Sequence, residues 1–169
     1  MTDIGAFPTI HDVLISGDNI YGMIAGETIL AGQVVGIAAS GTSNTVVCMD
    51  NTSGEHALGV ALHDASSAGK VAVAGLGCVV TCVNADDTTT IEAGDFVQQN
   101  DNAVLGTVSA FLVRAPLSSM ITDLNDTHSD ATYQMVGLAT TAFTATSAGG
   151  TGQVLLMPIL SLPTDHTVV

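Results

Sequence analysis

Residues 58–80 read LGVALHDASSAGKVAVAGLGCVV, which is an apolar run, a small polar turn and a second apolar run. Large and small side chains alternate over residues 58–62 and again over 71–74, and this period of two is typical of β-strands. The residues between them, 63–69, predict the loop of a β-hairpin. Four glycines in the stretch disfavour a helix, because each costs about 1 kcal/mol in a helix interior relative to alanine.

The composition favours strands and turns along the whole chain. Of the 169 residues, 47% are hydrophobic and 4% are aromatic, and there are 18 glycines. A chain of this length buries roughly 70% of the surface that its unfolded form exposes, which is enough for one compact domain or two small fused lobes. We expect an all-β fold, as a compact β-barrel or β-sandwich.

Three segments are repeated later in the chain, in the same order. The pairs are residues 28–35 with 90–97, 58–61 with 136–139, and 69–73 with 152–156. Their offsets are 62 (28 to 90), 78 (58 to 136) and 83 (69 to 152), so the second copy carries insertions. We predict two tandem, diverged β units. Chance similarity between valine-rich strands is the alternative.

The repeat suggests a division of the chain. We expect an N-terminal arm over residues 1–23, a first β unit over 24–84, a second over 85–160 with a loop or short-helix insertion at 105–133, and a C-terminal tail over 161–169. The arm could dock on a neighbour or pack back on its own domain. A first strand at residues 13–16 behind an unordered lead is the alternative.

Repeated glycines carry specific structural predictions. Gly32 and Gly94 each follow an alanine just before a strand, where a turn with positive φ is expected. Gly59 and Gly137 lie inside predicted strands, which indicates that two backbones approach closely there. All four are expected to be structural.

The charge balance excludes several classes of partner. There are 16 acidic residues against two basic ones, Lys70 and Arg114, and the formal net charge is −14. Such a surface repels phosphate backbones and anionic membranes, so we expect no direct nucleic-acid or membrane binding. Self-repulsion is relieved by salt, so a high-salt habitat is one explanation and plain solubility is the other. Residues 1–6 lack the basic start of a secretory signal, and a soluble chain is expected.

Candidate reactive groups are few. Oxygen ligands for calcium could come from one polar loop, but it lacks the glycine and the terminal glutamate of an EF-hand, and a solvated acidic loop is favoured. The loop contains Asp123, Asn125, Asp126 and Asp130.

The histidines, serines, lysine and cysteines have no catalytic spacing either. His63 with Asp64, and His56 nearby, could form a metal site or a general base, yet no HxH or HExxH pattern is present. Ser66 and Ser67 lack a GxSxG context, and Lys70 starts a strand instead of standing at a hairpin tip as in carrier lobes. Cys48, Cys78 and Cys82 are expected to be buried free thiols. We therefore expect no enzyme, no cofactor and no metal.

Two segments resemble small phage capsid decoration, or head cement, proteins. They are AGETILAGQVV at residues 25–35 and the LGVALHDASSAGKVAVAGLGCVV stretch. The resemblance covers residues 25–83 and recurs more weakly over 90–158. It implies a β-rich virion protein that binds the major capsid protein on the outer surface of an icosahedral shell, assembled in the host cytoplasm. It also implies a homo-oligomer, with a trimer favoured. Together with the acidic composition, the resemblance indicates a virus of a halophilic host.

In such proteins an N-terminal segment commonly contacts the capsid. By position alone, that role would fall to Phe7, Ile10, Val13 and Leu14. The alternative function is a receptor- or glycan-binding β module such as a head fibre, and a hydrolase with a cryptic site is a third. Sugar platforms need exposed aromatic rings, and this chain has no tryptophan and only Tyr21 and Tyr133 as tyrosines.

Overall fold

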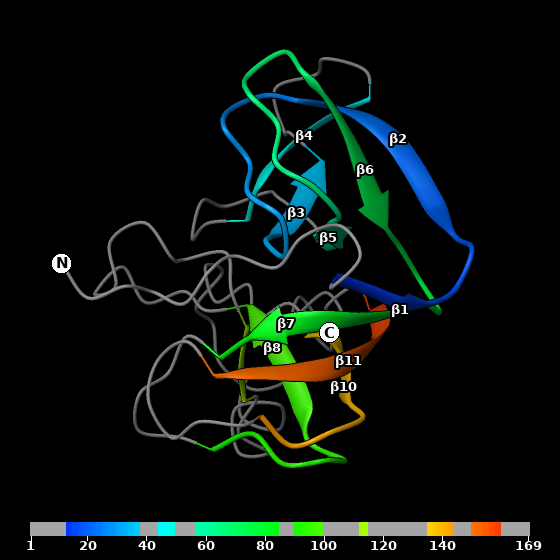
Figure 1. Cartoon of the computed structure of the whole chain (residues 1–169), viewed down its shortest axis with the longest axis vertical. Coiled ribbons are helices and arrows are strands. Elements are labelled where there is room, and N and C mark those ends of the chain that lie inside the picture. The colour runs from blue at the N-terminus through cyan, green and yellow to red at the C-terminus, as the bar shows by residue number, and fades with distance from the viewer. Residues whose placement is uncertain are drawn as a thin grey trace, which may run out of the picture.

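The structure is a computed structural model, and it describes residues 13–37, 44–49, 57–84, 90–99, 112–114, 135–143 and 150–159. Every element in these residues is a β-strand, so the all-β prediction is confirmed. The strands form a closed five-stranded barrel and a six-stranded sheet, which lie one above the other in Figure 1.

The order of neighbouring strands defines both parts. The barrel runs β2 (Ile20–Ala25), β4 (Thr45–Cys48), β3 (Val34–Ile37), β5 (Ala57–Ala61) and β6 (Lys70–Ala74). The sheet runs β1 (Leu14–Ser16), β7 (Val79–Val83), β11 (Thr151–Ile159), β10 (Met135–Ala139), β8 (Phe96–Gln99) and β9 (Leu112–Arg114).

The predicted hairpin is present as β5 and β6, which pair antiparallel with Ala61 opposite Val73. Closure of the barrel comes from β2, which pairs antiparallel with β6 and parallel with β4, where Ala25 lies opposite Val46. A closed barrel exposes no strand edge, and edges are the part of a sheet most prone to unwanted pairing. The interior is filled by small and β-branched side chains: Ala25, Ile29, Val35, Val46, Ala61, Ala65, Val71 and Val73.

The second arm of the hairpin is shorter than the sequence suggests. The apolar run continues to residue 83, and the boundary 24–84 places all of it in the first unit. In the structure β6 ends at Ala74, and β7 belongs to the six-stranded sheet between β1 and β11. The reason is a turn at residues 75–78, where Gly77 has a φ of +85°. One apolar run therefore supplies two strands to two different parts of the molecule.

Two strand pairings of the barrel recur in the sheet. Val34 lies opposite Val60 in the barrel, and Phe96 lies opposite Leu138 in the sheet, at the expected offsets of 62 and 78. The third expected match is shifted by two residues. Ala61 pairs with Val73 and Ala139 pairs with Val154, so β6 corresponds to β11 at an offset of 81 (73 to 154) instead of 83. A common origin of the two units stays a prediction.

The turns before β3 and β8 make the same hydrogen bonds. The Gly32 N–H donates to the Ala61 carbonyl and the Gly94 N–H donates to the Ala139 carbonyl, both over 2.8 Å. The two glycines have φ values of +85° and +95°, as the repeated Ala-Gly step predicts. Only glycine adopts this conformation at no steric cost, so the two turns need it.

Gly59 and Gly137 occupy equivalent places in β5 and β10. A Cβ built on Gly59 would collide with the Ala74 carbonyl oxygen of β6. A Cβ built on Gly137 would collide with the Leu155 carbonyl oxygen of β11 in the same way. Both positions therefore require a residue without a side chain, as expected from their place inside strands.

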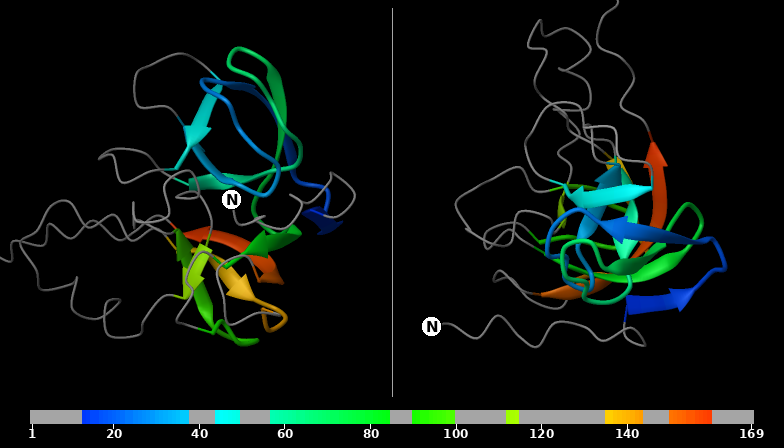
Figure 2. Two further views of the ribbon diagram at one scale, coloured as in Figure 1. Left: turned by 60° about the vertical axis from the view of Figure 1, so that its left-hand side comes forward. Right: turned by 90° about the horizontal axis from the view of Figure 1, so that it is seen from above.

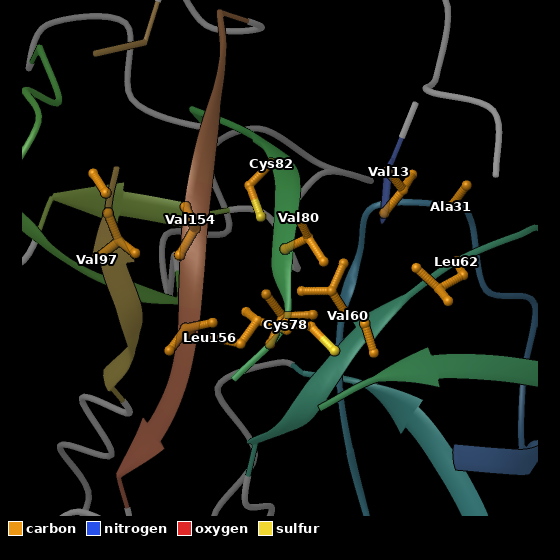
Figure 3. Packing of buried hydrophobic residues seen from close by; sticks show 14 of the residues in the cluster. Val13, Ala31, Val60, Leu62, Cys78, Val80, Cys82, Val97, Val154 and Leu156 are labelled. Carbon is orange, nitrogen blue, oxygen red and sulfur yellow. The ribbon is translucent and has the colours of Figure 1, made fainter. Parts of the chain in front are cut away.

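A second hydrophobic core joins the barrel to the sheet. Val60 and Leu62 contribute to it from the barrel, and Cys78 and Val80 contribute from β7 and the turn before it. Figure 3 shows these side chains meeting in one cluster, with Val154 and Leu156 of β11 on the far side. Figure 2 shows the two parts stacked from another direction. The barrel and the sheet are thus packed on each other.

The expected arm contributes to this packing. β1 and the first residues of β2 fall within residues 1–23, so the alternative of a strand near residues 13–16 fits the structure. β9 likewise lies in the range 105–133 that was expected to be an insertion, and it pairs with β8 through Val97 and Arg114. The tail at 161–169 lies outside the described residues.

The close backbone approach at Gly59 gives a direct test. Gly59→Ala should lower the free energy of unfolding by at least about 2 kcal/mol, because the backbone of β6 must move away from the new methyl group. Gly22→Ala is the matched control, since a Cβ on this β2 glycine meets nothing within 4 Å. The control should be neutral or stabilising by no more than about 1 kcal/mol. Equal effects in urea denaturation would contradict the assignment.

Candidate functional site

The hairpin loop at residues 63–69 and the turns beside it hold the polar side chains that the sequence singles out. His63 comes directly after the last ladder bond of β5 and β6, which the Leu62 N–H donates to the Ala72 carbonyl over 2.8 Å. The Ala72 N–H then donates to His63 Nε2 over 3.0 Å, and His63 Nδ1 lies 2.9 Å from the Asp64 carbonyl. This pattern assigns the hydrogen to Nδ1, so both ring nitrogens are engaged.

The second unit has a counterpart of this arrangement. The Gln153 N–H donates over 2.9 Å to the Thr141 hydroxyl oxygen, at the position that corresponds to His63. A hydroxyl oxygen and an imidazole nitrogen that carries no hydrogen can both accept a hydrogen bond from a backbone N–H. The role common to both residues is therefore to cap a strand where the ladder ends.

Asp64 and Ser67 bind the loop to the turn before β3. Asp64 Oδ1 accepts a hydrogen bond of 2.8 Å from the Ala31 N–H, and the Ser67 hydroxyl donates to the Gly26 carbonyl over 3.1 Å. Both partners are backbone atoms, so each side chain fixes chain geometry. The hairpin loop is held by its own polar groups.

Gln33 is the buried polar centre of the neighbouring turn. Its Oε1 accepts hydrogen bonds from the Leu30 N–H over 2.7 Å and from the Cys48 thiol over 3.1 Å. The Cys48 N–H donates to the Glu27 carboxylate over 2.8 Å. In the second unit Asp95 takes the place of Gln33. Its carboxylate accepts a hydrogen bond of 2.8 Å from the Glu92 N–H, just as Gln33 accepts one from the Leu30 N–H. These side chains also serve to hold turns.

The described residues bring no reactive set together. They contain no group of three or more His, Cys, Asp or Glu side chains that could hold a metal. His63 and Asp64 are adjacent, but both bind backbone, and Lys70 is exposed at the start of β6. His56 and the acidic loop of Asp123, Asn125, Asp126 and Asp130 lie outside the described residues. In the part of the chain that is described, no helix is long and apolar enough to cross a membrane.

The cysteines differ in accessibility. Cys78 and Cys82 are buried free thiols, as predicted, whereas Cys48 is partly exposed and that part of the prediction is wrong. Burial raises the pKa of the Cys82 thiol from 9.0 to about 12. The thiol therefore stays protonated in the folded chain when it would ionise in the unfolded one. Its contribution to stability is complete below pH 9 and is lost as the pH rises toward 12.

Two of the expected capsid-contact residues lie in the described chain, and both face inward. Val13 is fully buried, and the partly buried Leu14 packs against the same core. A contact through Val13 would require this segment to detach from its own core. Phe7 and Ile10 lie outside the described residues.

Sequence reasoning missed an exposed apolar group at the junction of the barrel and the sheet. Ile15, Ile20, Tyr21 and Leu76 are large, exposed and close to the turns that join β1 to β2 and β6 to β7. We call these four residues the junction patch. The turn residues Gly17 and Asn19 lie between Ile15 and the pair Ile20 and Tyr21, and this mixture of apolar and turn residues was the available signal.

Comparison with known proteins adds no family assignment. No protein-family model matches the chain, and no curated protein matches it. Function must therefore be inferred from the geometry and from the resemblance over residues 25–83.

Thiol labelling tests the accessibility of the three cysteines. At pH 8 the folded protein should react at Cys48 only, because Cys78 and Cys82 are buried. Thiolate is the reactive form, and burial also keeps Cys82 protonated. All three thiols of the sequence should react in denaturant. The modified sites are identified by peptide mass spectrometry, and Cys48→Ser should abolish native labelling. Rapid labelling of Cys82 in the folded protein would contradict its burial.

Proposed function

We propose that this protein is a virion structural protein that binds the outer surface of an icosahedral capsid and stabilises it. One observation supports the proposal above others. The segments that resemble decoration proteins, residues 25–35 and 58–80, supply the start of β3, most of β5 and all of β6 to a closed barrel whose loop side chains hydrogen-bond to backbone groups. The shared pattern thus specifies a rigid scaffold, as a protein that works by contact requires.

The physical properties of the described chain fit this role. A closed barrel packed on a sheet gives a stiff body, and a stiff body loses little conformational entropy when it binds. Decoration also multiplies a modest interface over many copies, so a single subunit needs no large contact area. A symmetric oligomer, with a trimer favoured, would add further contacts between neighbours.

The partner in this proposal is the major capsid protein, and the location is the outer face of the virion. The net charge of −14 supports two further elements. It disfavours direct contact with the packaged nucleic acid, and it suits a virus of a halophilic host, since concentrated salt screens the repulsion between acidic copies.

Co-purification with capsids tests the proposal. Capsids of the virus that encodes this chain should carry it in a fixed ratio to the major capsid protein, measured by quantitative mass spectrometry of gradient-purified particles. Capsids that lack the chain should release their contents at a lower temperature, because the added interfaces no longer hold the shell closed. Particles that are free of the chain, or equally stable without it, would refute the cement role.

A further inference from the structure

The junction patch combines high exposure with a rigid base. Leu76 is 57% exposed, Ile15 47% and Ile20 45%, although each has a large aliphatic side chain. The turns that carry these residues lie side by side, so a partner that covered them would remove this exposed apolar surface from water.

Hydrogen bonds fix the two turns that carry the patch. The Asn19 side-chain amide donates to the Leu76 carbonyl over 3.1 Å, and the Gly75 N–H donates to the Asn19 carbonyl over 2.9 Å. The Tyr21 ring lies directly over Gly75, where no Cβ could fit. The patch is therefore held in place before any partner binds, and a preorganised surface loses less entropy on association.

Gly17 ties the third segment to the same place. Its Cα lies so close to the Cys78 backbone that a Cβ on Gly17 would come within 2.7 Å of it, and its φ is +112°. This contact brings the end of β1, which carries Ile15, against the turn that carries Leu76. β1 is also the edge strand of the six-stranded sheet at this point, as Figure 1 shows.

The charge around the patch limits the kind of partner. Asp18 lies within it and is exposed, whereas the two basic residues of the chain are elsewhere. Lys70 lies opposite Ile24, toward the other end of β2 from Ile20, and Arg114 lies on β9 at the opposite edge of the sheet from β1. A second copy docked patch to patch would place one Asp18 carboxylate against the other. A partner with Lys or Arg around an apolar pocket would gain both burial and charge complementarity.

We propose that the junction patch is the docking surface for the capsid, and that it binds an apolar pocket of the major capsid protein that is rimmed by lysine or arginine. This inference rests on the proposed function and adds the surface and the chemistry of its partner. It moves the main contact from Val13 and Leu14, which the core uses, to Ile15, Ile20, Tyr21 and Leu76.

Matched substitutions test the surface. The double variant Ile15→Ser with Leu76→Ser should lower the affinity for decoration-free capsids by about tenfold or more, because both side chains lose their burial in the partner. Ile37→Ser is the control, since Ile37 is 43% exposed but lies elsewhere. Ile37 pairs with Val46, which pairs with Ala25 at the far end of β2 from Ile20. Both variants should keep the melting temperature of the parent protein, because the changed residues are exposed.

Carbodiimide cross-linking identifies the partner. The Asp18 carboxylate should couple to a lysine of the capsid protein in the bound state, and Asp18→Asn should remove that cross-link. Self-association through the patch would not bring Asp18 to Lys70, which lies toward the other end of β2. It would appear as an oligomer in analytical ultracentrifugation of the parent protein that is lost in the double variant, and that result would assign the patch to self-association and overturn the inference.

The outcomes separate the two proposals. If the parent protein and both variants bind capsids equally, the capsid function stands and the junction patch is wrong. If the parent protein does not bind capsids, the proposed function fails, and the inference fails with it. Selective loss of binding in the double variant, together with a cross-link from Asp18 to a capsid lysine, supports both.

Discussion

Packing between the barrel and the sheet is the interaction on which the rest of this structure depends. Val60 and Leu62 on the barrel share a core with Cys78 and Val80 on the sheet side (Figure 3). The fully buried side chains of the barrel interior are alanines, valines and one isoleucine, and only Met23, Cys48 and Leu58 are added to them as partly buried residues. Small single cores supply only a few kcal/mol of stability, so a barrel of this kind needs the sheet against its outer face.

This shared core also explains the choice of residues elsewhere. Gly59 and Gly137 allow the partner strands of their hairpins to approach closely, because a Cβ at either position would collide with the partner's backbone. The loops at the strand ends are fixed by side chains such as His63 and Thr141, which bind backbone N–H groups. Polar groups are thus used for the scaffold, and the exposed apolar residues at the junction remain for recognition.

Much of this fold could be predicted from local sequence. Alternation over residues 58–62 and 71–74 indicated β5 and β6, and the Ala-Gly steps indicated the positive φ of Gly32 and Gly94. Alternation could not show that β7 leaves the barrel, because a buried strand has the same pattern in either sheet. The sequence did not indicate β2, because its exposed Ile20 and Tyr21 break the alternation that one buried face would give.

Candidate chemistry was harder to judge than the fold. The sequence suggested that His63 and Asp64 were weak candidates, and their backbone hydrogen bonds give the physical reason. The apolar and turn residues at 15–21 were a signal for part of the junction patch, but its assembly from two turns about 60 residues apart could not be predicted. Residues of this separation become neighbours only through the pairing of β1 with β7 and of β2 with β6.

Calorimetry of the whole chain tests the central claim most directly. If the barrel and the sheet depend on one shared core, thermal unfolding in concentrated salt should give a single transition. Its calorimetric and van't Hoff enthalpies should then agree, which is the criterion for two-state unfolding. Two resolved transitions, or a van't Hoff enthalpy well below the calorimetric one, would show that the parts unfold independently and would contradict this account.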